Sequence, residues 1–344
     1  MTRRKSRFIF ISVLVFTIVL FLFAYKEGFR NNVSNNKPNY DLYIENESTY
    51  ESVFDQLVNQ QILIDTVSFK LISKLLGYAD HNIKSGHYLL KPGTNNYKLI
   101  AKLRSGNQDP IKVTINNVRD IDRLCGKLDG YLMLDSVALL ERFKDTIYLQ
   151  TIGYTPENIL SLFIPNTYEM YWNISIDKFI QRIQTEHDKF WTKDERKSKA
   201  LALGLDTKGV YSLASIVEKE TIVESERPSI AGVYLNRLKT GMKLQADPTV
   251  VFALGLAGIQ RVLLEHLQYP SPYNTYLNDG LPPGPIYMPS VNSIDAVLNA
   301  EKHDFIFFCA KPGYQGTHCF AATLSQHYEN ARHYQKWLNT ERIR

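Results

Sequence analysis

Two glutamates that lie two positions apart are the residues best suited to chemistry in this sequence. Glu218 and Glu220 interrupt an apolar segment that we expect to form a buried helix from about residue 208 to residue 222. An α-helix turns by about 100° per residue, so the two side chains point to nearly opposite faces. Glu220 falls about 20° from Leu213, on the apolar face, whereas Glu218 lies well off it. A carboxylate directed toward a core must be neutralised, paired or used.

Glu220 has two interpretations. In the structural one, it pairs with Arg227, Arg237 or a backbone donor. In the chemical one, a pocket of low dielectric constant keeps the carboxyl protonated near neutral pH, as a general acid requires. Cleavage of a glycosidic bond needs such an acid at the leaving oxygen. Residues typical of clefts follow downstream and favour the chemical interpretation: Asn236, Gln245, Asp247, Tyr273, Asn274 and Tyr276.

The downstream segments have alternatives of their own. Asp247 precedes Pro248, so it could form an Asx-turn or cap the following segment 249–254. The other interpretation places Gln245 and Asp247 in one cleft, where they bind sugar hydroxyls or N-acetyl groups. The Pro-rich stretch 269–286 presents Tyr and Asn side chains suited to sugar rings, although a loop packed on the core has the same composition.

Other chemistries find little support. His318 and His327 have no Ser or Cys elbow motif nearby, which argues against a hydrolase triad. No Cys–His spacing suits a metal, and we expect no metal and no other cofactor. The net charge of +5 is small for 344 residues and gives no case for nucleic-acid binding. We interpret Cys309 and Cys319 as two buried thiols on neighbouring strands, with a disulfide as the alternative.

The N-terminus predicts a membrane location. A basic cluster in residues 3–7 precedes an uncharged apolar run at residues 8–24, which is at the short end of what crosses a bilayer. Basic residues before the run predict that the N-terminus lies inside and the remainder outside. A cleavable signal peptide is the alternative, but it normally has a shorter apolar region and a small-residue cleavage site. We therefore predict a retained single-pass anchor.

The elements that must position the candidate residues fall into four segments. We predict a cytoplasmic tip and transmembrane anchor at 1–25, a polar linker at 26–40, a small domain at 41–110 and a larger domain at 111–344. The small domain has the pattern β-α-α-β-α. The larger one combines helical patterns with short strands, including a hairpin at 305–322. The predicted fold class is α+β, with a cleft in the larger domain.

Many motifs, in a fixed order, resemble the YceG-like (MltG) family of endolytic murein transglycosylases. They are the segments 214–221, 226–227, 236–238, 241–242, 244–245, 247–250, 273–276 and 280–286. The resemblance covers essentially the whole chain, including the anchor and a LysM-like domain around residues 83–106. Asn166 departs from it, since many members carry Asp there, and so does the segment 319–322.

The resemblance implies a lyase that cuts nascent peptidoglycan strands between N-acetylmuramic acid and N-acetylglucosamine and leaves a 1,6-anhydro-muramyl end. The family's catalytic glutamate falls on Glu220, with Glu218 as the second candidate. One glutamate suffices if the muramyl 6-hydroxyl is the nucleophile, because the same group protonates the leaving oxygen and then accepts the hydroxyl proton. The resemblance also implies a bacterial cytoplasmic membrane, with the catalytic domain on the extracytoplasmic side.

The implied partners are peptidoglycan glycan strands, the lipid bilayer through residues 8–24, and the cell-wall synthesis machinery. Two other functions remain open from the sequence. One is an anchored peptidoglycan-binding scaffold that has lost activity. The other is a muramidase-type hydrolase, for which Asp247 is the best second carboxylate.

Overall fold

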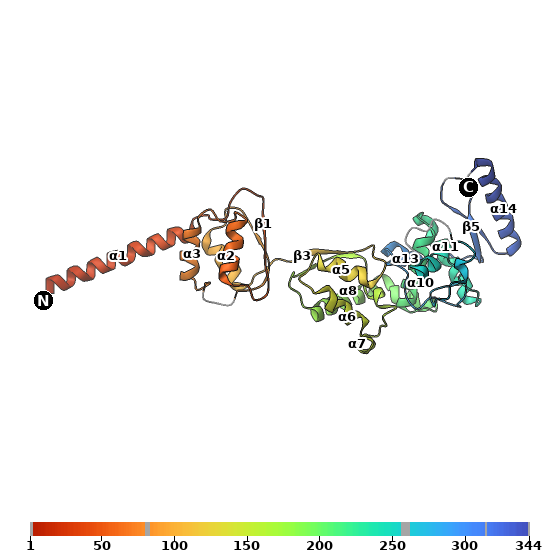
Figure 1. Ribbon diagram of the computed structural model, residues 1–344, viewed down its shortest axis with the longest axis horizontal. Helices are drawn as coiled ribbons and strands as arrows, with labels where there is room; N and C mark the ends of the chain where they lie inside the picture. Colours follow the sequence, from red (N-terminus) through yellow and green to blue (C-terminus); the bar gives the residue numbers. More distant parts are fainter. Residues whose placement is uncertain (1–2, 80–82, 256–261, 314, 343–344) are drawn as a thin grey trace. The chain divides into compact units, whose positions relative to one another are not determined.

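The computed structural model describes residues 3–79, 83–255, 262–313 and 315–342 of the chain (Figure 1). Residues 1–2 of the predicted cytoplasmic tip lie outside this part, as do the side chains of the basic cluster at 3–7. The chain forms two compact units, which are described one at a time. The first comprises residues 1–112, 131–133 and 169–174, and the second comprises residues 113–130, 134–168 and 175–344.

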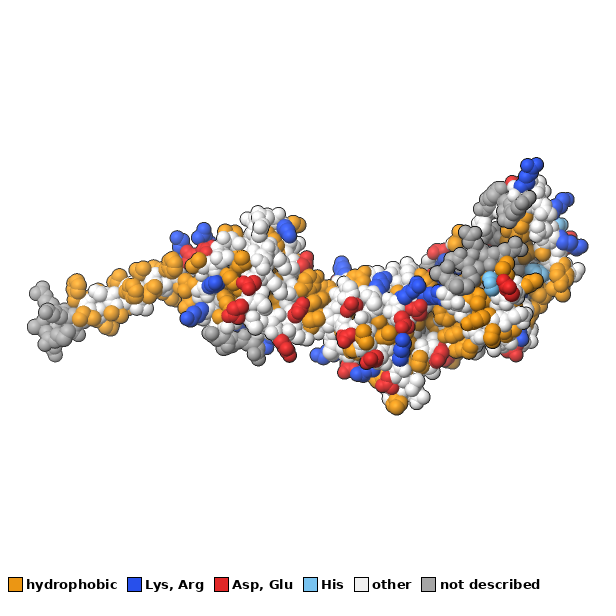
Figure 2. All heavy atoms as spheres, viewed as in Figure 1, with side chains coloured by type: hydrophobic (Ala, Val, Ile, Leu, Met, Phe, Trp, Pro, Cys, Tyr) orange, Lys and Arg blue, Asp and Glu red, His pale blue; other side chains and the backbone are white. Residues whose placement is uncertain are grey.

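Helix α1 (Arg3–Phe29) carries the apolar run of the N-terminus. Its segment Phe8–Phe29 has a mean hydropathy of 2.8. The side chains of residues 8–23 are exposed, and Figure 2 shows hydrophobic side chains all along this part of α1, with white backbone and other side chains between them. Within the described ranges, α1 is the one helix long and apolar enough to cross a membrane by itself. It fits the single transmembrane anchor that the sequence predicts.

A small domain makes up most of the remaining first unit. Its elements are β1 (Tyr40–Ile44), α2 (Tyr50–Asn59), α3 (Thr66–Leu75), β2 (Gly86–Leu90) and α4 (Asn96–Ser105). β1 and β2 pair antiparallel, from Tyr40 opposite Leu90 to Ile44 opposite Gly86. Side-chain caps start the three helices, namely Thr49, Asp65 and Asn95. The predicted order β-α-α-β-α is confirmed.

Residues 26–40 do not form the flexible linker predicted from their polar composition. Asn32 and Val33 are buried. The Asn32 side chain donates to the carbonyl oxygen of Asp65 (2.8 Å) and to Oδ1 of Asn96 (2.7 Å), and it accepts the backbone N–H of Asp65 (2.6 Å). The asparagine that suggested solvent exposure instead satisfies polar groups inside the domain. This segment belongs to the small-domain structure.

The second unit combines helices with short strands. Its α-helices before the candidate site are α5 (Ile121–Asp129), α6 (Ser136–Lys144), α7 (Thr146–Thr151), α8 (Ile176–Thr192) and α9 (Arg196–Ala202). Strand β3 (Ile111–Ile115) pairs with β4 (Asn166–Met170), and β5 (Phe307–Ala310) pairs antiparallel with β6 (His318–Ala321). Together with the β1–β2 pair of the small domain, the described residues hold three two-stranded sheets among many helices, which is the mixed α+β fold that the sequence predicts.

Helix α10 (Thr207–Glu220) carries the two candidate acids. Residues 210–217 are buried, and α10 packs against α11 (Arg227–Lys239) and α13 (Val291–Leu298). It ends at Glu220 rather than near residue 222, because Thr221 has an extended backbone and its Oγ1 accepts the N–H of Val223 (3.0 Å). Glu220 is therefore the last residue of a buried helix.

Candidate active site

Glu220 lies half-buried at the end of α10, next to α11. The hydroxyl of Tyr234 donates to Oε1 of Glu220 over 2.6 Å, and Tyr234 is itself buried. This contact fixes one carboxyl oxygen. The other oxygen has no hydrogen-bond partner among the described residues, so it can face a substrate.

The surroundings of Glu220 favour its protonated form. Burial raises the pKa of Glu220 to about 7; the hydrogen bond from Tyr234 lowers it, the charge of Asp247 raises it and Arg237 lowers it. A carboxyl with that pKa keeps a proton in a large fraction of molecules at neutral pH. This is the property that a general acid needs.

Glu218 has a different environment. Its Oε2 accepts the backbone N–H of Ser290 (2.6 Å), the hydroxyl of Ser290 (2.6 Å) and the hydroxyl of Ser293 (2.8 Å). Ser290 is the N-cap residue of α13. Glu218 thus ties α10 to the start of α13, and this arrangement supports a structural role.

Asp247 lies near enough to Glu220 for their charges to interact. It is the first residue of α12 (Asp247–Leu254) and is exposed, and the residue that precedes the helix is Ala246. The hydroxyl of Tyr276 donates to Oδ1 of Asp247 over 2.6 Å. Asp247 therefore makes no capping hydrogen bond of the kind that the structural interpretation required. The structure brings Glu220, Asp247 and Tyr276 into one electrostatic group.

Gln245 is exposed and lies two residues before Asp247. Its φ of 49° is in the left-handed region, where a residue with a side chain is strained. Its backbone N–H donates to the carbonyl of Thr275 over 3.1 Å, which holds this segment against the Pro-rich loop. Such strain is often found where a loop positions a functional side chain.

Three of the predicted substrate-binding residues have structural partners. Asn274 is fully buried; its amide donates to the carbonyls of Leu267 and Tyr269, and its Oδ1 accepts the N–H of Tyr276. Because every polar atom of its side chain is used and shielded, Asn274 shapes the loop and does not contact a substrate directly. This differs from the sequence prediction.

Asn236 and Tyr273 are also directed elsewhere. The Asn236 amide donates to the carbonyls of His303 (2.7 Å) and Phe305 (3.0 Å), which holds the segment that leads into β5. The ring of Tyr273 packs on Phe252 of α12 at a centroid distance of 4.7 Å. These contacts give both residues positioning roles, and their predicted contact with a substrate stays a prediction.

A recess of about 320 Å³ opens beside Glu220. Its walls are the end of α10, the β5–β6 hairpin and the terminal helix α14 (Leu324–Glu341). Among its lining residues are Glu220, Thr221, Lys311, His318, Tyr334 and Trp337. Gln245, Asp247 and Tyr273 are not among them, so the recess is not the cleft that the sequence predicted.

His318 and Glu226 were not recognised as a pair from the sequence. Oε1 of Glu226 accepts the backbone N–H of His318 (2.7 Å), and Oε2 lies 3.0 Å from Nδ1 of the imidazole. The hydroxyl of Thr221 also donates to Oε2 of Glu226 (3.3 Å). The position of Glu226 within the motif 226–227 could have marked it as a candidate residue. Its contact with His318, 92 residues away, could not have been predicted from spacing in the sequence.

The cysteines and histidines of the described ranges form no group of three or more potential metal ligands with acidic residues. Cys309 and Cys319 lie directly opposite each other on β5 and β6 and are free thiols. The prediction of two thiols on neighbouring strands agrees with this arrangement, but both thiols are half-buried and not buried as predicted.

Comparison with known proteins assigns the chain to a family. The model of the YceG-like family matches residues 42–333. The chain belongs to the YceG-like family. The endolytic murein transglycosylase of Bacillus subtilis (strain 168) is 27% identical over 311 residues, which cover 85% of this chain and 84% of that protein. The motif-based resemblance is thereby confirmed.

Two further matches support membership of the YceG-like family. The endolytic murein transglycosylase of Streptococcus pneumoniae serotype 2 (strain D39) is 28% identical over 302 residues, which cover 79% of this chain and 54% of that protein. A crystal structure of a yceG-like protein from Listeria monocytogenes superposes with a TM-score of 0.55 at 27% identity. This match covers 86% of this chain and 99% of that one.

Proposed function

We propose that this chain is an endolytic murein transglycosylase, a lyase that cuts peptidoglycan glycan strands. Its bond is the one between N-acetylmuramic acid and N-acetylglucosamine, and its product carries a 1,6-anhydro-muramyl end. The observation that carries the proposal is the environment of Glu220. Glu220 is a half-buried carboxyl whose pKa is raised by burial to about 7 and whose one oxygen is fixed by Tyr234. These are the properties that a general acid needs.

One carboxyl is enough for this reaction. The free oxygen of Glu220 donates its proton to the glycosidic oxygen as the bond from that oxygen to C1 of the muramyl residue breaks. The muramyl 6-hydroxyl then attacks C1, and its proton passes to the Glu220 carboxylate. The proton lost in the first step is thus regained in the second, no water is consumed, and the intramolecular attack gains from a high effective concentration.

Asp247, Tyr276 and Gln245 are the residues that we assign to substrate contact. Asp247 and Gln245 are exposed, and Asp247 is held by the hydroxyl of Tyr276. A carboxylate at this position also opposes the loss of the proton from Glu220. The group can therefore bind sugar hydroxyls and maintain the acid at the same time.

We place the protein in a bacterial cytoplasmic membrane, with its N-terminus inside and the catalytic unit on the extracytoplasmic side. The apolar helix α1 supports the anchor, and the basic residues that precede it favour this orientation. Peptidoglycan strands made at that surface are the substrate, and the cell-wall synthesis machinery is a natural partner. Protease added outside intact spheroplasts should degrade the catalytic unit if the orientation is right.

The decisive experiment is digestion of purified peptidoglycan followed by mass analysis of the sugar ends. The wild-type chain should release 1,6-anhydro-muramyl ends, and Glu220→Gln should release them at less than about a hundredth of that rate, the usual weight of a general acid. Glu218→Gln is the matched control, because it removes the neighbouring charge and leaves Glu220 in place. Wild-type activity in Glu220→Gln would refute the assignment.

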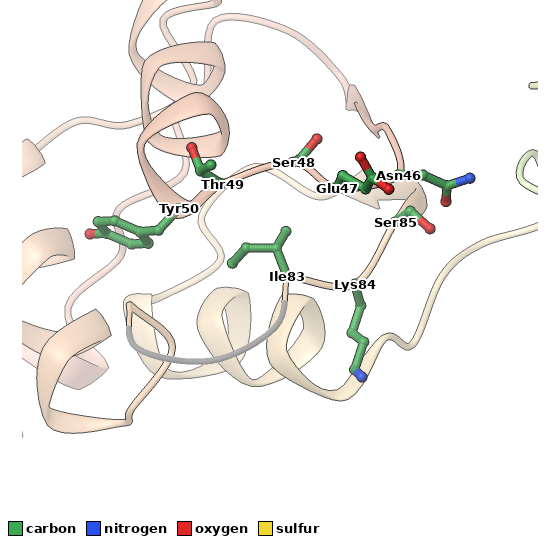
Figure 3. Close-up of a pocket in the computed structure, with 8 residues that line it drawn as sticks. All are labelled: Asn46, Glu47, Ser48, Thr49, Tyr50, Ile83, Lys84 and Ser85. Atoms are coloured by element: carbon green, nitrogen blue, oxygen red, sulfur yellow. The ribbon is translucent and has the colours of Figure 1, made fainter.

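The same assay separates two alternatives. Reducing ends in place of anhydro ends would establish a hydrolase, with Asp247 as the second carboxylate. Binding without new ends would establish a scaffold. The feature that favours a scaffold is a polar recess of about 510 Å³ in the predicted LysM-like domain, between the loops 46–50 and 83–85 (Figure 3). The retained Glu220 environment argues against loss of activity.

A further inference from the structure

The recess beside Glu220 has an aromatic wall that the proposed reaction has not yet used. Tyr334 and Trp337 of α14 both line it, with ring centroids 5.7 Å apart and ring planes 29° from parallel. Leu338 lines the same side. Residues spaced by three and four positions share one face of a helix, so α14 presents a continuous apolar strip to the recess.

The wall is held in place by the earlier part of α14. His327 stacks on Phe307 of β5 at a centroid distance of 5.2 Å, and the amide of Asn330 lies 3.5 Å from the carbonyl oxygen of Phe320. Thr323 caps the helix by accepting the N–H of Gln326. The rings of Tyr334 and Trp337 are therefore positioned by the hairpin whose other residues form the opposite side of the recess.

The remaining lining is polar and carries defined hydrogen-bonding groups. His318 has its Nδ1 engaged by Glu226, which leaves Nε2 as the ring nitrogen that can meet a ligand. Thr221 and Lys311 lie on the same lining. Aromatic rings that line a recess together with a few fixed polar groups suit a sugar ring, which has an apolar C–H face and a rim of hydroxyls.

Glu220 borders this recess and also interacts with Asp247 and Tyr276, which lie outside it. An enzyme that cuts within a strand has to hold sugar residues on both sides of the bond. We propose that the recess between Glu220 and α14 is a saccharide subsite on one side of that bond, in which Trp337 and Tyr334 stack on a pyranose ring. This inference rests on the proposed function, and it leaves Asp247, Tyr276 and Gln245 for the other side.

Binding tests the subsite without catalysis. The probe is soluble glycan strands freed of stem peptides, titrated into the full-length chain in detergent with Glu220→Gln as the parent. Adding Trp337→Ala should weaken binding about tenfold, because a stacking surface is lost. Trp337→Phe keeps a ring and should bind within about twofold of the parent. Tyr328→Ala is the matched control, since Tyr328 is an exposed aromatic residue of α14 that does not line the recess.

Tryptophan emission gives a second readout that a purely structural role would not move. Bound strands should change the emission of the parent, and the change should vanish in Trp337→Phe while its affinity remains. Trp172 and Trp191 stay as the unchanging background. If Trp337→Ala fails to fold, as judged by thermal unfolding, then the emission of Trp337→Phe and the affinity of Tyr334→Ala decide the matter.

The inference is overturned if Trp337→Ala binds strands as tightly as its parent. It is also overturned if strand binding changes the emission of the parent and of Trp337→Phe by the same amount. Cleavage distinguishes this failure from failure of the proposed function. Trp337→Ala in the active chain should raise KM about tenfold for peptide-free strands. If Trp337→Ala leaves KM unchanged while Glu220→Gln is inactive, then the subsite proposal is wrong and the proposed function stands. If Glu220→Gln still cleaves glycan strands, then the proposed function of Glu220 is wrong, whatever the effect of the Trp337 variants.

Discussion

Burial is the main cause of the raised pKa of Glu220, and two neighbouring side chains adjust this pKa in opposite directions. The Tyr234 hydrogen bond lowers the pKa of Glu220, and the charge of Asp247 raises it. Because the acid form is the one that starts the reaction, kcat/KM should fall as the pH rises through about 7. Asp247→Asn lowers this pKa, so the fall should begin about half a pH unit lower. Tyr234→Phe raises it and should move the fall upward by a similar amount.

The pH profile of kcat/KM on peptidoglycan fragments, measured for both variants, checks this pair. Opposite shifts identify Glu220 as the titrating group. If both profiles move in the same direction, or neither moves, then another residue sets the pH dependence. Any loss of absolute rate through weaker binding does not affect the test, because the position of the fall is what is compared.

The environments of single residues show which features of the site could be predicted from the sequence. Helical periodicity predicted that Glu220 faces the core, and the structure places it half-buried, where burial raises its pKa although polar groups such as Tyr234 and Asp247 lie close to it. The same periodicity left Glu218 outside the core, yet Glu218 is half-buried because α13 covers that face of α10. Asn274 was predicted to bind substrate, but a loop turn consumes its amide. Which polar group finds a partner depends on contacts across dozens of residues, which spacing in the sequence does not encode.

At the scale of elements, Glu218 links α10 to α13. Three hydrogen bonds converge on one of its oxygens, so Glu218→Ala leaves a backbone N–H and two hydroxyls without their acceptor. We expect a loss of about 1–3 kcal/mol in the free energy of unfolding. Glu218→Gln should lose less, because its carbonyl oxygen can still accept.

Urea unfolding of the two Glu218 variants measures this effect, and the pH profile of the surviving activity is the control. An unchanged pH profile with lower stability supports a structural role. If Glu218→Ala keeps full stability and loses all activity, then Glu218 rather than Glu220 is the acid.

Among the elements, the strands and helices of the small domain were predictable because caps and turns punctuate them clearly. Thr49, for example, caps α2 by accepting the N–H of Ser52, the role that threonine favours at the start of a helix. For Asp247 the sequence left two interpretations open, and the capping one is wrong, because α12 begins at Asp247 itself and its carboxylate accepts the hydroxyl of Tyr276. The recess wall on α14 was missed for a different reason. Its aromatic residues repeat at helical spacing, but only the fold shows that this face meets the end of α10.

At the scale of the whole molecule, the segment after the anchor contributes to stability. A chain that begins at residue 25 keeps the contacts of Asn32 and Val33, whereas one that begins at residue 38 loses them. Asn96 would then lack its partners at Asn32 and at the carbonyl of Glu27. We expect the small domain of the shorter chain to unfold at a lower urea concentration, with a free energy of unfolding that is lower by about 2–4 kcal/mol.

Hydrogen exchange of the β1–β2 amides, compared between the two chains, locates the loss in the small domain. The longer chain serves as the control, because both lack the apolar part of α1. Equal protection in the two chains would show that residues 26–37 are a tether, as their composition suggested.

The buried segment after α1 also sets a distance. A disordered stretch of that length would let the small domain wander about 20 Å from the bilayer. Instead, the uncharged apolar run of α1 ends at residue 24, and Glu27, three residues later, is already buried. Little free chain therefore separates the hydrocarbon from the folded protein. We expect the anchor to fix the distance of the small domain from the membrane as well as its location. Inserting a flexible spacer after residue 25 should therefore change the depth of the wall that the protein can reach.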